Sequence, residues 1–454
     1  MFAGFLSVTT DRVLATVGLA FTALVVATAF LVLDATTYDV GAAAIIAPVL
    51  LLLSVPILQR QARREDDSTI FRLLLLALVL KLVASFLRYY VDFHIYGGAT
   101  DALGYHQAGI RWSEALSAGG FGNQGQGLTG TNFIELVTGV VYVVTRPTVL
   151  GGCLVFSWIS YWGLYFFYRA FVIAVPEGRS RTYARMVFFL PSLLFWPSGT
   201  GKEAWMIFTL GIACFGAAKL FDGRTWPGLS GLALGLWLAS LARPHVAAIL
   251  AISLAVAGAV ATLWGRARAI SFGRRVVTLT AAAGVSFLLV ISTREYLQAS
   301  YVSTDDGVLS TLGEIEHRTA QGGSEFEPIV VDSPVVFPAA AVTVLFRPFI
   351  VEAHSAQMLV SAIEGSVLLL ICVVKFRWAL AAVGSMRRQP YVLFALIFTA
   401  VFIVAFSSIA NFGILARERV QVLPLLLVAF AVPPRLPTLG HGTVIAGANE
   451  VRAS

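Results

Sequence analysis

The chain has 454 residues, of which 58% are hydrophobic and only 13% are charged, and its mean hydropathy is +0.82. Soluble domains carry roughly 25% charged residues because their surfaces must be solvated, so this composition excludes a soluble globular protein. The net charge of +7 does not indicate nucleic-acid binding, because the basic residues fall in short clusters between apolar runs. The sequence predicts an all-α, polytopic transmembrane bundle in which residues 1–454 form a single integral membrane domain.

Twelve apolar segments are predicted to cross the membrane. In chain order they cover residues 14–33, 40–58, 70–87, 149–172, 187–197, 204–219, 228–241, 246–263, 276–292, 356–374, 391–406 and 420–432. The first is interpreted as an uncleaved span, because it is too long for the apolar region of a signal peptide and lacks a clear cleavage site. Segments 187–197 and 420–432 are short, which is typical of helices that border a water-filled cavity.

The loops between these segments differ in charge, and this difference predicts their side of the membrane. The basic loops contain Arg60, Arg63 and Arg64; Arg179, Arg181 and Arg185; Lys219 and Arg224; Arg266, Arg268, Arg274 and Arg275; and Lys375, Arg377, Arg387 and Arg388. Cytoplasmic loops carry an excess of lysine and arginine. We therefore expect a multi-pass protein of a bacterial inner membrane, with both termini and the tail 433–454 in the cytoplasm and the working face outside.

Two long outer loops are expected to carry the function, since loops of this length are usually functional. The first covers residues 88–148 and contains an amphipathic stretch, 102–117, that is predicted to form a helix in the membrane interface. It also contains an apolar stretch, 133–145, that is too short to span. The second outer loop covers residues 293–355 and is acidic.

Isolated cations lie at the predicted outer ends of spans, where the charge bias should have removed them. In the turn before residue 204, glycines precede a helix that begins near Lys202, which suits a phosphate or another anion. In the alternative interpretation, Lys202 simply pairs with Glu203 in a tight hairpin. Guanidinium groups match phosphate oxygens. The predicted site for a diphosphate or a lipid-linked phosphate therefore consists of Lys202, Arg243, Arg347, Arg417 and Arg419; in a transferase it would hold the donor phosphate.

Other polar residues are predicted to support this site. Arg417 and Arg419 are two positions apart and would face different ways on a helix, so one is expected to bind the ligand while the other pairs with Glu418 or Glu364. The predicted supporting or substrate-binding residues are Tyr105, His106, Glu203, His245, Glu352, Glu364 and Asn411.

Asp101 is the candidate catalytic residue, at the start of the predicted interfacial helix. A carboxylate there can take a proton from an acceptor hydroxyl while nearby cations stabilise a departing phosphate. A helix N-cap is the alternative role for Asp101. His106 and His245 are interpreted as hydrogen-bonding residues, because no motif with metal-ligand spacing accompanies them. No cofactor is required, and the sequence leaves dependence on a divalent cation open.

An acidic residue in the first large outer loop, followed by an interfacial helix and about a dozen spans, resembles the GT-C superfamily of membrane glycosyltransferases. The segment from Asp101 to His106 is similar to their loop motif. Trp196–Glu203 and Arg243-Pro244 resemble segments of bacterial polysaccharide-biosynthesis proteins. The resemblance implies inverting transfer of a sugar from a polyprenyl-phosphate donor to a glycan or lipid acceptor on the outer face, with Asp101 as the base.

Two other functions stay open at the level of sequence. An O-antigen-type polysaccharide polymerase or ligase also uses outer arginines and a large outer loop, and His317, Arg318 and Glu352 would then carry acceptor chemistry. A lipid or glycolipid transporter would have internal repeats and ionisable residues near the bilayer midplane. No clear repeat is present, but Lys81 lies within the third predicted span.

Overall fold

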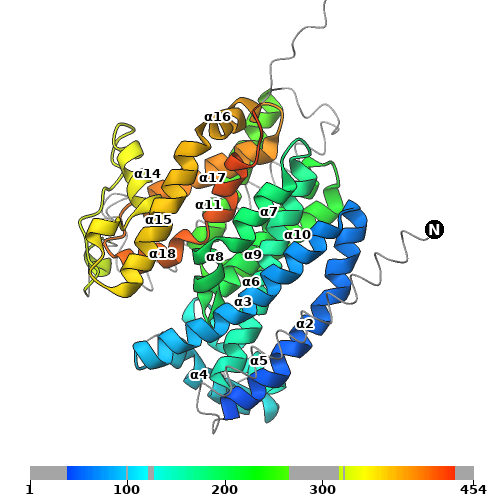
Figure 1. Cartoon of the computed structure of the whole chain (residues 1–454), viewed down its shortest axis with the longest axis vertical. Helices are drawn as coiled ribbons and strands as arrows, with labels where there is room; N and C mark the ends of the chain where they lie inside the picture. Colours follow the sequence, from blue (N-terminus) through cyan, green and yellow to red (C-terminus); the bar gives the residue numbers. More distant parts are fainter. Residues whose placement is uncertain (1–37, 99–100, 121–126, 265–315, 321–322, 435–454) are drawn as a thin grey trace, which may run out of the picture.

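The computed structural model describes residues 38–98, 101–120, 127–264, 316–320 and 323–434, and Figure 1 shows them as a helical bundle. The first half contains α2 (Tyr38–Glu65), α3 (Ser68–Tyr90), the π-helix η1 (Val91–Ile95), α4 (Asp101–Ser117), α5 (Thr131–Thr145), α6 (Val149–Ala174), α7 (Ser180–Phe189), α8 (Pro191–Phe195), η2 (Trp196–Ser198), α9 (Lys202–Phe221), α10 (Thr225–Ala242) and α11 (Pro244–Leu263). The second half contains α14 (Phe337–Phe346), η4 (Ile350–Glu352), α15 (Ala356–Val374), α16 (Phe376–Ser385), α17 (Pro390–Phe406), α18 (Phe412–Arg419), α19 (Leu423–Leu426) and η5 (Leu427–Phe430).

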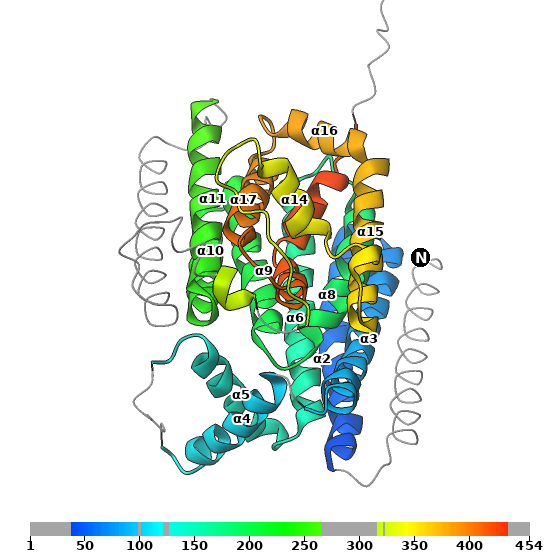
Figure 2. The ribbon, with the colours of Figure 1, turned by 90° about the vertical axis from the view of Figure 1, so that its left-hand side faces the viewer.

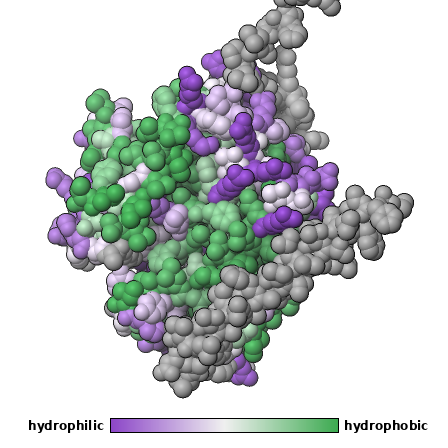
Figure 3. Space-filling model, in the orientation of Figure 1, coloured by the Kyte–Doolittle hydropathy of each residue, from purple (hydrophilic) through white to green (hydrophobic). Residues whose placement is uncertain are grey.

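Several of these helices have the length and composition of membrane spans. Five qualify, namely α2, α3 extended by η1, α6, α9 and α11, and the pair α15 and α16, bent by 66°, would add a sixth. In Figure 3, apolar side chains cover much of one face, while hydrophilic ones gather toward the end where α2 joins α3. The all-α bundle is therefore confirmed for the described residues. The count of twelve spans stays a prediction, and segments 14–33 and 276–292 lie outside the described residues.

Basic loops lie at a different end of the bundle from the predicted interfacial helix. Arg181 in α7 forms a 2.8 Å ion pair with Asp67 in the turn between α2 and α3. The guanidinium of Arg179 lies 4.9 Å from the ring of Trp378 in α16. Helices α4 and α5 lie at the opposite end of the bundle from α16 (Figure 2). The loops with Asp67, Arg181 and Arg179 and the helix α16, all predicted to be cytoplasmic or next to cytoplasmic loops, thus lie together at one end, and the predicted interfacial helix, observed as α4, lies at the other.

Glycines let neighbouring helices approach closely. A Cβ atom added to Gly211 in α9 would lie 2.3 Å from the carbonyl oxygen of Gly163 in α6. A Cβ added to Gly235 in α10 would lie 2.4 Å from the backbone nitrogen of Ala213 in α9. Small residues at helix crossings give the close backbone packing on which association in membranes depends. These contacts fix α9, whose first turn carries Lys202 and Glu203, against both of its neighbours.

The short predicted span 187–197 is a broken helix, and two buried charges from other helices hold it. Glu364 in α15 accepts a 2.7 Å hydrogen bond from the backbone N–H of Ser192, in the first turn of α8. Lys81 in α3 donates to the carbonyl oxygens of Leu193 at 2.6 Å and Leu194 at 3.1 Å. In a continuous helix the carbonyl of Leu193 would bond to residue 197, which is a proline and has no N–H. Lys81 therefore supplies the hydrogen-bond donor that Pro197 cannot provide.

The last predicted span, 420–432, is not one continuous helix. The chain runs through α19 and η5, of four residues each, and every residue from Val420 to Val432 is buried. Tyr183 in α7 donates a 2.9 Å hydrogen bond to the carbonyl of Pro424, and Ala431 accepts one from the N–H of Arg179 at 2.9 Å. The apolar composition of this segment reflects its place in the protein core.

Candidate active site

A cavity of about 290 Å³ lies where α3, α4, α9 and α18 converge. Its charged lining consists of Arg88, Asp92, Asp101, Glu203 and Arg417. Tyr105 and Asn411, also predicted as site residues, line it too. The structure therefore brings together the candidate base and one of the five predicted phosphate-binding cations.

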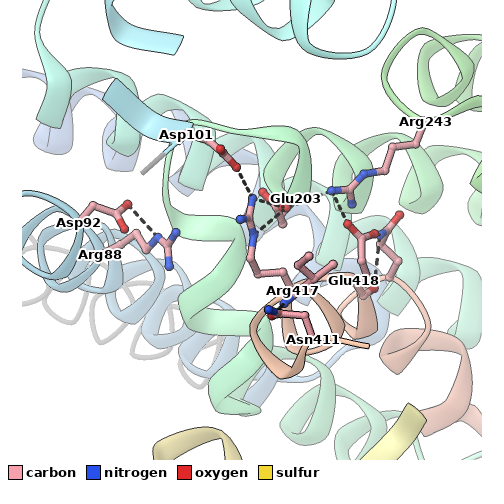
Figure 4. A network of polar contacts seen from close by, with 10 residues as sticks. Arg88, Asp92, Asp101, Glu203, Arg243, Asn411, Arg417 and Glu418 are labelled. Atoms are coloured by element: carbon pink, nitrogen blue, oxygen red, sulfur yellow. Dashed lines mark hydrogen bonds and ion pairs between the residues drawn. The ribbon is translucent and has the colours of Figure 1, made fainter. Parts of the chain in front are cut away.

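Arg417 is the centre of the ionic contacts in this cavity (Figure 4). Its Nη2 donates to Asp101 Oδ2 at 2.8 Å and to Glu203 Oε1 at 3.2 Å. The side chain of Asp101 is 61% exposed, whereas that of Glu203 is 8% exposed. The contact to Asp101 is therefore the accessible one, and the contact to Glu203 forms the buried floor of the site.

Arg243 extends the network behind the cavity. Its Nη2 lies 3.1 Å from Glu203 Oε1 and 2.7 Å from Glu418 Oε1. All three side chains are nearly buried, and buried charges persist in proteins when they are paired and hydrogen-bonded. Lys202 interacts electrostatically with the same groups but does not line the cavity. The predicted cations at Lys202 and Arg243 thus balance carboxylates in the network.

Residues at the N-termini of α18 and α9 help to orient the site. Asn411, the N-cap of α18, accepts with its Oδ1 a 3.1 Å hydrogen bond from the N–H of Ile414 in the first turn and another at 3.1 Å from the hydroxyl of Ser324. The second outer loop therefore helps to fix the helix that carries Arg417. At the start of α9, the helix dipole favours the negative charge of Glu203.

The electrostatic setting shifts several pKa values around Arg417. The carboxylates of Glu203 and Asp101 raise the pKa of Arg417 although burial lowers it, so the guanidinium stays cationic. Burial, reinforced by the charge of Glu203, raises the pKa of Tyr105. Burial also raises the pKa of Glu418, and the charge of Arg243 opposes this effect. In this compact site, the pKa of each charged group therefore depends on the charges of its neighbours.

Arg88 and Asp92 form a second ion pair in the cavity that the sequence did not single out as part of the site. Arg88 Nε lies 3.0 Å from Asp92 Oδ2. The guanidinium lies 5.1 Å from the ring of Phe195 and 5.0 Å from that of Trp196. Asp92 is in the π-helix η1, and such insertions are frequent at functional sites. The available signal was the spacing of four between Arg88 and Asp92, which places both on one helical face.

The remaining predicted site residues lie elsewhere. Arg347 pairs with Glu352, and its Nε donates to Glu352 Oε1 at 2.9 Å. Arg419 is buried and donates to the carbonyl oxygens of Leu345 at 2.8 Å and Arg347 at 3.0 Å. Its position agrees with the prediction that Arg417 and Arg419 face different ways, but its bonds are to backbone carbonyls.

Three further predicted residues also have structural contacts. Glu364 caps α8, as described above. His106 is hydrogen-bonded to the hydroxyl of Tyr142, at 2.8 Å from Nδ1, and joins α4 to α5. His245 is half-buried, and its ring lies 6.1 Å from that of Phe406. None of the three lines the cavity.

The fold and the site define the chain as an all-helical bundle with membrane-capable helices and a charged cavity toward the end where α4 and α5 lie. In the part of the chain that the structure describes, no group of three or more His, Cys, Asp or Glu side chains is arranged to hold a metal ion. In comparisons with known proteins, no family model, no curated protein and no solved structure matches this chain.

Proposed function

We propose that the protein is a membrane glycosyltransferase that moves a sugar from a polyprenyl-phosphate-linked donor to a glycan or lipid acceptor, with inversion. The observation that carries this proposal is the exposed contact between Asp101 and Arg417 in one cavity. A proton acceptor and a phosphate-binding group are the two parts that such a transfer needs. Here they lie within hydrogen-bonding distance of each other.

The donor phosphate would compete with Asp101 for Arg417. Phosphate oxygens and carboxylate oxygens accept the same guanidinium hydrogen bonds. Arg417 also contacts the buried Glu203, which would keep the guanidinium in place while Asp101 leaves it. Binding of the donor would then free the Asp101 carboxylate at the moment when a base is needed.

The transfer itself would take place between the two separated groups. The acceptor oxygen forms a bond to the anomeric carbon as the bond from that carbon to the phosphate oxygen breaks. Asp101 receives the proton of the acceptor hydroxyl, and the electron pair of the broken bond stays on the departing polyprenyl phosphate. Arg417 stabilises the added negative charge, which is the kind of preorganised electrostatic contribution that dominates many enzymes.

The spatial separation of the loops supports an extracytoplasmic site in a bacterial inner membrane. The basic loops that the structure describes include those that meet at the end carrying Arg179 and Trp378, and cytoplasmic loops carry the excess of lysine and arginine. Asp101, which lines the cavity, is the first residue of α4, and α4 lies toward the other end (Figure 2). Labelling of single cysteines introduced at Glu114 and at Glu177 with a membrane-impermeant reagent would test this orientation.

The transporter and polymerase alternatives receive less support from the contacts. Lys81, the ionisable residue that favoured a transporter, bonds to the backbone of the broken helix. Glu352, assigned to acceptor chemistry in a polymerase or ligase, pairs with Arg347 and lies outside the cavity. Comparing monosaccharide-phosphate with oligosaccharide-diphosphate donors in vesicles would separate the two enzyme classes.

The decisive test is Asp101→Asn in the full-length protein, reconstituted in vesicles with polyprenyl-phosphate-linked sugars. Loss of a general base should lower transfer by about 10²–10⁴-fold. Binding of polyprenyl phosphate should become tighter, because Arg417 loses a competing carboxylate. The matched control is Asp222→Asn, which removes the carboxylate of an exposed pair with Arg224. Unchanged transfer by a folded Asp101→Asn protein that still binds polyprenyl phosphate would refute the proposal.

A further inference from the structure

A second cavity, of about 350 Å³, lies beside the first. The two cavities share Tyr96, Trp196 and Gly413 in their linings. The remaining walls of the second cavity come from residues 354–355 and the start of α15, from Pro348, from Phe412 and from residues 323–324. Because the shared residues border both spaces, a molecule that fills the second cavity ends at the charged cavity containing Asp101.

The lining of the second cavity differs in chemistry from that of the first. Its aromatic residues are Tyr96, Trp196 and Phe412, and its hydroxyl residues other than tyrosine are Ser324, Ser355 and Ser361. Among the described residues, no Lys, Arg, Asp or Glu lines it, and its one imidazole is that of His354. The first cavity carries charges of both signs, whereas this one offers rings and hydroxyl groups.

This chemistry discriminates between the ligands that a site beside Asp101 could take. A phosphate would find no lysine or arginine in the described lining. An alkyl chain would bury serine hydroxyls against hydrocarbon, which costs free energy unless they keep hydrogen-bond partners. A sugar unit has an apolar C–H face that packs on aromatic rings, and its hydroxyls exchange hydrogen bonds with serine side chains. Mostly apolar walls with a few placed polar groups are typical of small-molecule sites.

We propose that the second cavity binds the acceptor, and that this acceptor is an uncharged glycan. The inference rests on the proposed glycosyltransferase function and selects the glycan over a lipid acceptor. The terminal hydroxyl of the glycan extends past Tyr96 and Trp196, which border both cavities, into the first cavity. There Asp101 accepts its proton.

A pair of serine variants on one helix tests this assignment. Ser361→Leu fills the second cavity with a branched apolar side chain. Ser366→Leu makes the same change on α15 at a residue that is also half-buried and lines neither cavity. Both proteins are studied at full length in lipid nanodiscs, with a panel of short neutral oligosaccharides and with polyprenyl phosphate as separate probes. His354→Ala, at an exposed position, serves as a second variant if Ser361→Leu does not fold.

The expected result is a loss of about tenfold or more in oligosaccharide affinity for Ser361→Leu, with unchanged binding of polyprenyl phosphate and no effect of Ser366→Leu. The assignment is overturned if no oligosaccharide binds, or if Ser361→Leu binds it like the parent protein. Weaker binding of polyprenyl phosphate alone would overturn it in favour of a lipid-chain site. Oligosaccharide binding sensitive to Ser361→Leu, combined with Asp101→Asn transferring at the parent rate, would keep the glycan site and reject the proposed transfer chemistry.

Discussion

Arg417 and Asp101 lie 316 positions apart in the sequence, yet Arg417 Nη2 donates to Asp101 Oδ2 at 2.8 Å. The contact joins α18 to the first residue of α4. Because Arg417 also bonds to Glu203 at the start of α9, a single side chain connects three separate segments. The position of the candidate base therefore depends on a residue near the other end of the chain.

Substitutions of Arg417 should separate the effect of its charge on sugar transfer from the effect of its hydrogen-bond geometry. Arg417→Gln removes the cation that would stabilise the departing phosphate, and we expect transfer to fall by about 10²–10³-fold. Arg417→Lys keeps the charge but loses the planar fork, so its activity should lie between those of Arg417→Gln and the parent. Steady-state transfer rates and polyprenyl-phosphate binding measure both effects. Equal activity of Arg417→Gln and the parent protein would contradict the role of Arg417.

The contributions of the buried residues Arg243 and Glu418 to the unfolding free energy should be strongly coupled. Arg243→Met leaves Glu418 buried without the cation that lies 2.7 Å away, which should cost about 3–5 kcal/mol of unfolding free energy. The double variant Arg243→Met/Glu418→Met should lose less than the sum of the two single variants. Denaturation in mixed micelles measures these differences. Arg224→Met, in the exposed pair with Asp222, is the control and should cost less than about 1 kcal/mol; additive effects would mean that Arg243 and Glu418 are independent.

His106 should make stability depend on pH. Burial lowers its pKa below 6.5, although the charge of Asp39 opposes this effect, so the folded protein favours the neutral ring. The stabilisation is fully present above the unfolded pKa and is lost as pH falls below it. The Tm should therefore drop between about pH 7 and about pH 5, and His106→Gln should make that drop smaller. His94→Gln, at an exposed position of η1, should leave the profile of the parent protein unchanged.

The crossing of α6 and α9 should not tolerate a single methyl group. In Gly211→Ala the new Cβ would lie 2.3 Å from the carbonyl oxygen of Gly163, and forcing the helices apart should cost about 1–3 kcal/mol. At Gly41 in α2, an added Cβ meets no atom within 4 Å, so Gly41→Ala should be neutral. Thermal unfolding in nanodiscs compares the two variants. Similar Tm values for both would show that the bundle relaxes around Gly211 without cost.

Patterns along the chain were enough to predict the class of fold and several of its elements. Apolar runs of span length predicted α2, α3, α6 and α11 because a membrane-capable helix must be apolar along its whole length. The amphipathic stretch 102–117 predicted α4, and the alternation of basic loops predicted the two ends of the bundle. The broken helix at 187–197 could be predicted less fully, since it depends on Lys81 and Glu364 from distant helices.

The site was predicted only in part, because a sequence shows which charges exist but not which of them meet. Asp101, Glu203, Asn411 and Arg417 were singled out from their places between apolar segments, and they share one cavity. Arg347 and Arg419 looked equivalent to Arg417 in sequence, yet one pairs with Glu352 and the other with backbone carbonyls. Asp92 was recognised as a site residue only through its place in the cavity lining.

The sequence by itself determined that the chain forms apolar helices and that basic residues cluster in loops between them, because both follow from composition and order along the chain. Only the tertiary structure decided the partner of each cation. An ion pair requires two side chains within about 4 Å, and the distance between Arg417 and Asp101 is set by how α18, α9 and α4 pack. That packing places the exposed carboxylate of Asp101 against Arg417, one of the five cations that the sequence had assigned to a phosphate site.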